Sequence, residues 1–301
     1  MLKKIVFICF TIAMFGSCSS CNHGTSADLL IPDSILFKEE NQVSAEAMQN
    51  IVENISSPVE IAAMIKNSGV PFSRDYLATT DKVSQYTASF QHAFVLGIYG
   101  ADLGYLNMYQ KTSAMLDYLS AIKSLSDAIK IGQFFDFSTL KRLSTNNTNL
   151  DSLVYISVHN FNQMDKYLRD NNRGSMSSLM ISGAWIEGMY ILTQVVKDKP
   201  SKELSDWVAN QQVFLGDIVS ILKSYTRDPQ YNSLYTDFER IKDAYSGVVI
   251  TYEQAEPEVV EQDGMQMIVQ KDKTTITMSD ETLKKIIDTI ADVRNSYLKV
   301  I

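Results

Sequence analysis

Residues 96–106 read LGIYGADLGYL, and residues 181–191 read ISGAWIEGMYI. Both stretches are apolar, and each contains a single acidic residue, Asp102 or Glu187. Their apolar residues follow helical spacing, which predicts two helices buried in a core. A core built on two such helices indicates an all-α fold.

The two stretches resemble each other. A shift of 85 positions aligns Asp102 with Glu187 and Tyr105 with Tyr190, whereas a shift of 84 aligns the small residues instead. We interpret this as a duplicated helical hairpin whose register stays open between the two shifts. Small residues four apart let backbones approach, which predicts tight helix crossings at Gly100, Gly104, Ala184 and Gly188.

Helical periodicity extends from about residue 43 to 245. We expect helices at about 48–55, 57–69, 80–110, 112–131, 150–168, 175–197, 200–225 and 230–247. The loops between them are short, so the body is predicted to be a mainly antiparallel helical bundle.

The composition changes after Gly247. Residues 248–252 favour strand, and Asp263-Gly264 is a common hairpin turn, so we expect a small β-hairpin insertion at about 248–278. Ser279 is expected to cap a final amphipathic helix. We therefore predict a single helical domain over residues 43–301 with this hairpin near its C-terminus.

The N-terminus has the pattern of a secretory signal over residues 1–17. Two lysines precede an apolar run of about eleven residues, too short for the roughly 20 that a membrane-spanning helix needs. Gly16 and Ser17 then precede Cys18, which predicts lipidation at Cys18, with Cys21 as a second candidate. Residues 18–42 are interpreted as a polar tether. Under ordinary secretion without lipidation, Cys18 and Cys21 could form a disulfide.

The formal net charge is −8, which excludes the basic footprint of a nucleic-acid-binding domain. Membrane attachment is therefore expected through the lipid anchor. The three histidines lack the spacing of metal ligands on a helix, and no nucleophile elbow or phosphate loop occurs, so we expect no metal, no cofactor and no catalytic residue.

Several stretches carry a resemblance to a known family. They are SPVEIAAMIKNSGVPFSRDYL (57–77), LGIYGADLGYLNMY (96–109), GAWIEGMYILTQ (183–194) and the tail from residue 250. The chain resembles uncharacterised helical lipoproteins of Bacteroidetes-type bacteria. The resemblance implies an envelope location and a helical fold, and it transfers no site residue.

The two acidic residues are the main site candidates. Asp102 lies at helical spacing from two tyrosines, and Glu187 lies close to a tryptophan and a tyrosine. The candidate ligand-binding residues are Tyr99, Asp102, Tyr105, Trp185, Glu187 and Tyr190. Alternatively, tyrosine hydroxyls or helix-end amides satisfy the two carboxyl groups, which are then structural.

We therefore expect a cell-envelope lipoprotein, anchored in the outer membrane, whose domain is a non-enzymatic helical module. Its partner would be a small ligand or another envelope protein. The alternative is an envelope hydrolase that uses Asp102 and Glu187 as an acid/base pair, which requires both carboxyl groups in one pocket that solvent reaches.

Overall fold

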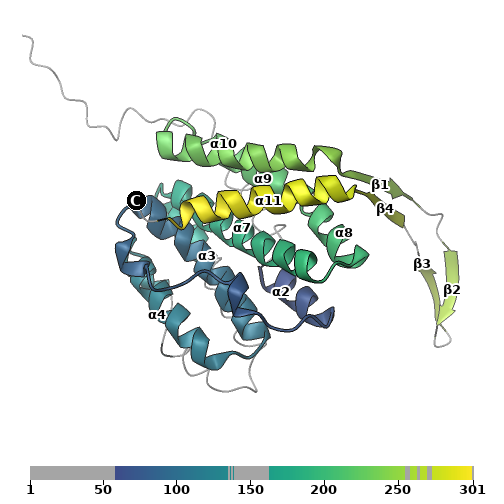
Figure 1. Ribbon diagram of the computed structural model, residues 1–301, viewed down its shortest axis with the longest axis horizontal. Helices are drawn as coiled ribbons and strands as arrows, with labels where there is room; N and C mark the ends of the chain where they lie inside the picture. The colour runs from purple at the N-terminus through teal and green to yellow at the C-terminus, as the bar shows by residue number, and fades with distance from the viewer. Residues whose placement is uncertain are drawn as a thin grey trace, which may run out of the picture. The chain divides into compact units, whose positions relative to one another are not determined.

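The computed structural model describes residues 58–134, 136, 138, 163–254, 258–262, 265–269 and 273–299, all within one unit over residues 41–301 (Figure 1). The predicted signal peptide, the tether with Cys18 and Cys21, and the helix expected at 48–55 lie outside the described residues. The helix predicted at 150–168 is described only from residue 163, and the chain is helical from 163 to 170.

The described chain is mostly helical with a small antiparallel β addition, which confirms the predicted fold class. The longer helices are α2 (Pro58–Asn67), α3 (Ser89–Met108), α4 (Thr112–Ala128), α7 (Gly174–Asp198), α8 (Lys202–Asn210), α9 (Gln212–Lys223), α10 (Pro229–Ala244) and α11 (Asp280–Tyr297). Short 3-10 helices are η2 (Arg74–Tyr76), η3 (Val83–Gln85), η4 (Gly132–Phe134) and η5 (Tyr245–Gly247). The strands are β1 (Val249–Glu253), β2 (Glu258–Gln262), β3 (Met265–Val269) and β4 (Lys273–Thr277).

The helices α3 and α7 form the centre of the core and have the most extensive mutual contact among the described elements. They run in the same direction. Near their first turns, Tyr231 packs on the Phe90 ring of α3 and on Tyr225, whose hydroxyl would lie 3.0 Å from a Cβ added at Gly174 of α7. At their far ends, η2 and the residue before it bind both helices, since Tyr76 donates to Asp198 of α7 (2.7 Å) and the Ser73 amide donates to α3. The other helices surround this parallel pair.

The two central helices approach each other closely at Gly97 and Gly183. A Cβ added at Gly97 would lie 2.1 Å from the carbonyl oxygen of Met180 and 2.8 Å from the amide nitrogen of Ala184. A Cβ at Gly183 would lie 2.0 Å from the carbonyl oxygen of Phe94. The prediction for Ala184 is therefore right, but that for Gly100 is wrong, because a Cβ at Gly100 would meet nothing within 4 Å.

The helix α7 is long and apolar enough to cross a membrane, the one such helix among the residues the structure describes, but 83% of its most apolar window is buried inside the domain. Its composition therefore fits its place in the core.

The C-terminal helix α11 completes the bundle and lies antiparallel to α10. Tyr297 donates to Asp237 (2.9 Å), and Asp292 pairs with Arg240 (2.8 Å), so the chain numbers rise along one helix as they fall along the other. The predicted cap is confirmed, because the Ser279 hydroxyl accepts the Thr282 amide at 3.1 Å.

Two predicted helices have different bounds in the structure. The helix expected at 80–110 begins only at Ser89, because Ala88 is extended and local bonds such as Asp81 N–H to Thr79 Oγ1 (3.3 Å) compete with helix formation. The helix expected at 200–225 divides into α8 and α9 at Gln211.

The β addition consists of two antiparallel pairs. The strands β2 and β3 form the hairpin around Asp263-Gly264 that the sequence predicts, and β1 pairs with β4 with Val249 opposite Thr277. The ribbon stands between η5 and α11 in the chain.

Candidate functional site

The parallel packing of α3 and α7 brings Asp102 and Glu187 together. Each follows the glycine crossing of its own helix by about one turn, and the two carboxyl groups are close enough for the negative charge of Glu187 to act on Asp102. Both side chains are 0% exposed. The sequence alignment that pairs Asp102 with Glu187 therefore corresponds to neighbouring positions in the structure. Both positions lie inside the core.

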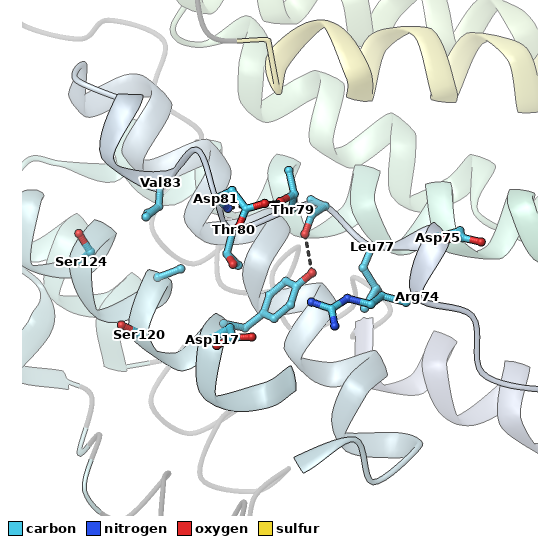
Figure 2. A pocket seen from close by; sticks show the side chains of 13 residues that line it. Arg74, Asp75, Leu77, Thr79, Thr80, Asp81, Val83, Asp117, Ser120 and Ser124 are labelled. Carbon is cyan, nitrogen blue, oxygen red and sulfur yellow. Dashed lines mark hydrogen bonds between the residues drawn. The ribbon is translucent and has the colours of Figure 1, made fainter. Parts of the chain in front are cut away.

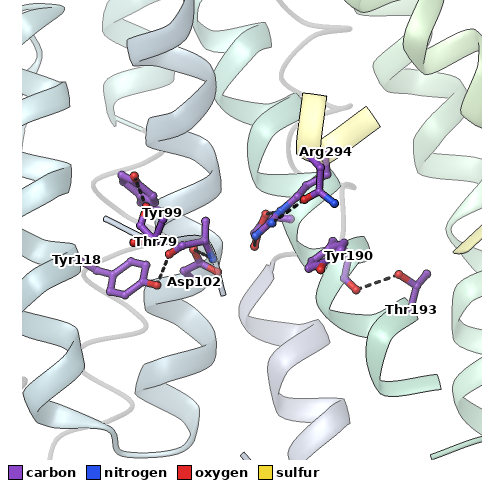
Figure 3. Close-up of polar contacts among 10 residues, drawn as sticks. Thr79, Tyr99, Asp102, Tyr118, Tyr190, Thr193 and Arg294 are labelled. Carbon is purple, nitrogen blue, oxygen red and sulfur yellow. Dashed lines mark hydrogen bonds and ion pairs between the residues drawn. The ribbon is translucent and has the colours of Figure 1, made fainter. Parts of the chain in front are cut away.

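A third charged group, Arg294 of α11, completes the cluster (Figure 3). Its Nε and Nη2 atoms donate to the two Glu187 carboxylate oxygens at 2.7 and 2.6 Å, and its guanidinium lies 4.2 Å from the ring centre of Tyr190. Two parallel hydrogen bonds from a guanidinium make a strong pair with a carboxylate, and the aromatic face adds a cation–π contact. Glu187 is thus the ionised partner of Arg294.

Asp102 lies on the side of this cluster away from Arg294, and its charge state differs from that of Glu187. Burial and the negative charge of Glu187 raise the pKa of Asp102 well above its usual range, and the nearby positive charge of Arg294 offsets this only in part. The fold therefore favours the neutral, protonated form of the Asp102 carboxyl group. The cluster then carries one negative and one positive charge, which suits its burial.

Side chains of the central helix α3 also bind segment 70–88, which connects α2 to α3 and contains only the short 3-10 helices η2 and η3. The Asp102 Oδ2 atom accepts the Ala78 amide at 3.2 Å, and the Tyr99 hydroxyl donates to the Thr79 carbonyl at 2.9 Å (Figure 3). The Tyr118 hydroxyl of α4 donates to the Ala78 carbonyl. Residues 78 and 79 are therefore held to the core by three side chains.

The same pattern continues along α3. The Tyr105 hydroxyl accepts the Ser73 amide at 3.2 Å, and the Tyr109 hydroxyl donates to the Val70 carbonyl at 2.6 Å. At the other end of the segment, His92 Nε2 contacts the Tyr86 carbonyl at 2.8 Å. Backbone groups of this segment that pack on the core lie outside regular helix and sheet, so they must find other partners, and this row of side chains supplies them.

The six predicted ligand-binding residues are thus divided among separate contacts. Asp102, Glu187 and Tyr190 belong to the charged cluster, while Tyr99 and Tyr105 hold segment 70–88. Trp185 packs on Phe238 of α10, with ring centres 5.8 Å apart. Five of the six are at most 1% exposed, and Tyr190 is half-buried, so together they form no pocket that solvent reaches.

An open pocket of about 750 Å³ does lie next to the cluster, on the outer side of segment 74–83 (Figure 2). One wall is this segment and the other is α4. The lining residues are Arg74, Asp75, Leu77, Ala78, Thr79, Thr80, Asp81, Val83, Asp117, Tyr118, Ser120, Ala121 and Ser124. Ala78 and Tyr118 connect the pocket wall to the core, because Ala78 bonds inward to Asp102.

Sequence reasoning missed Arg294 and the pocket. Arg294 stands four residues after Ile290 and one after Val293, on the apolar side of the last helix, where a charge implies a buried partner. This position on the apolar side of the helix was the sequence signal that could have identified Arg294 as buried. The pocket had none, because its lining consists of ordinary polar residues on segment 74–83 and α4.

No group of three or more metal-ligating side chains occurs among the residues that the structure describes. Comparisons with protein-family models, with curated proteins and with solved structures find no match. The function is therefore inferred from the geometry of the described residues.

Proposed function

We propose that this chain is a cell-envelope lipoprotein whose helical domain is a non-enzymatic binding module for a small polar ligand. The N-terminal pattern supports export and lipidation at Cys18, with attachment to the outer membrane. The observation that carries the binding function is the open polar pocket between segment 74–83 and α4.

The pocket has the features of a binding site. Its volume falls within the range of about 300–1,000 Å³ typical of small-molecule sites. Its lining combines one guanidinium, three carboxylates and several hydroxyls, and the buried wall behind it is fixed by the bonds to Asp102, Tyr99 and Tyr118. A preformed wall lowers the entropy cost of binding.

The hydrolase alternative has less support. An acid/base pair must reach its substrate, and Asp102 and Glu187 are fully buried. In addition, Glu187 is already engaged by both bonds from Arg294.

Binding to another envelope protein remains the second candidate. The specific observation in its favour is strand β1, where Val249 is 55% and Tyr252 is 71% exposed. Exposed apolar side chains on a two-stranded ribbon are typical of a protein contact.

The pocket is tested by screening polar small molecules, among them monosaccharides, amino acids, polyamines and inorganic phosphate, for a rise in the melting temperature of the purified protein. Ser120→Trp fills the pocket from α4, and Ser220→Trp, at an exposed position of α9, is the matched control. We expect a ligand that stabilises the wild type and Ser220→Trp but not Ser120→Trp. Equal binding by all three proteins would contradict the pocket assignment.

The anchor is tested separately by labelling cells with a palmitate analogue. We expect the label on the wild-type chain and on Cys21→Ser, with none on Cys18→Ser, and fractionation should move Cys18→Ser out of the membrane. Label that depends on Cys21 alone would transfer the anchor to that residue.

A further inference from the structure

We propose that the protein contains a proton-dependent lock, in which one proton held on the fully buried Asp102 fastens residues 77–80, a wall of the pocket, to the helical core. The lock is a property of the fold. Its consequence for binding rests on the proposed function of the pocket.

The bonds that the two carboxyl groups make show which of them holds the proton. Oδ2 of Asp102 accepts the Ala78 amide, and Oδ1 finds no N–H or O–H donor among the described residues. Two carboxyl groups close together inside a core attract each other only when one of them carries a proton. Glu187 accepts both bonds from Arg294, so the proton belongs on Asp102.

The groups around the carboxyl pair keep their charge states. Tyr99 of α3 and Tyr118 of α4 face Asp102, and burial raises the pKa of both phenols, so they stay neutral. Arg294 of α11 keeps its charge, because Glu187 raises the pKa of the guanidinium. Arg74 of η2 faces Tyr118 and is also a permanent cation. Asp102 is thus the group in this cluster whose protonation changes as pH rises above the ordinary range of a carboxyl group.

Loss of the proton from Asp102 weakens the attachment of the pocket wall. Ionised Asp102 would place two negative charges against the single guanidinium of Arg294, without water. The side chain relieves this by moving toward solvent, and Ala78, whose amide it binds, lines the open pocket. Opening of the wall therefore releases one proton, and higher pH favours the open form.

The magnitude follows from linkage. Opening that releases one proton becomes tenfold more favourable for each pH unit, from just above the ordinary pKa of a carboxyl group up to the raised pKa of Asp102. In the wild-type full-length protein, we expect the protection factor of the Ala78 amide against hydrogen exchange to fall by about tenfold per pH unit across this range. Because the wall opens without unfolding of the core, the Ile218 amide of α9 should be better protected than the Ala78 amide at every pH.

Asp102→Asn is the matched variant. The amide oxygen of asparagine can accept the Ala78 N–H, and its NH₂ group can donate to Glu187, so the variant copies the protonated acid without a proton to lose. We expect its Ala78 protection to be independent of pH. Equal slopes in wild type and Asp102→Asn, or equal protection of the Ala78 and Ile218 amides in the wild type, would overturn the lock.

A second measurement does not depend on exchange. Infrared spectroscopy of the wild type at pH 7 should show the carbonyl band of a buried protonated carboxylic acid, and Asp102→Asn should lack it. A spectrum without this band in the wild type would also overturn the proposal. Neither measurement uses a ligand, so failure of the lock and failure of the binding function are separate results.

Discussion

Replacing Gly97 with alanine should separate the two central helices. The new Cβ would lie 2.1 Å from the Met180 carbonyl oxygen, and real Cβ contacts essentially never fall below 3.0 Å, so the backbones must move apart by about 0.9 Å. A gap of that size removes a quarter to a half of the dispersion energy at each affected contact. We therefore expect a loss of about 3 kcal/mol, the upper end for overpacked cores, and a melting temperature lower by about 6–12 °C.

The assay is chemical and thermal unfolding followed by circular dichroism. Gly100→Ala is the control on the same helix, since its Cβ meets open space and alanine favours a helix by up to about 1 kcal/mol over glycine. A Gly97→Ala protein as stable as the wild type would refute the close crossing. Gly183→Ala should lower the free energy of unfolding by less in the Gly97→Ala protein than in the wild type, because Gly97→Ala has already moved the helices apart.

Three further variants test the cluster and the last helix. Arg294→Leu should cost about 3–5 kcal/mol, because it leaves Glu187 buried without its cation, and Glu187→Leu in the same chain should recover most of that loss in urea unfolding. Wild-type stability should fall as pH rises from the ordinary pKa of a carboxyl group up to the raised pKa of Asp102, since over this range the folded state holds a proton that the unfolded chain has released; pH-dependent melting of Asp102→Asn should lack this decline. Ser279→Ala should cost about 1 kcal/mol, while Ser279→Asp, which can still cap α11, should retain wild-type stability; a loss for both variants would contradict the capping role.

The regular parts of the fold could be predicted from local patterns. The stripe of apolar residues defines α11, and Asp263-Gly264 defines the β2–β3 hairpin, because each signal lies within a few neighbouring residues. The shared pattern of Asp102 and Glu187 also indicated a relation that the structure realises as neighbouring positions in the core.

The remainder depends on contacts that no local pattern encodes. The start of α3 at Ser89 follows from bonds between segment 70–88 and side chains far along the chain, such as Tyr105 to Ser73. The partner of Glu187 is 107 residues away. The carboxyl pair was therefore predicted as a pair, but its burial and its cation were set by tertiary packing.

The parallel arrangement of α3 and α7 has a consequence for the order of folding. Helices that run the same way cannot be joined by a tight turn, so the apolar face of α3 must wait for α7 to emerge during synthesis. Until α11 has been synthesised, Glu187 lacks the guanidinium of Arg294 that pairs with its carboxylate in the core. Chains that end before Arg294 should therefore stay loosely packed and aggregate, because the core is completed only after the C-terminal helix has been made.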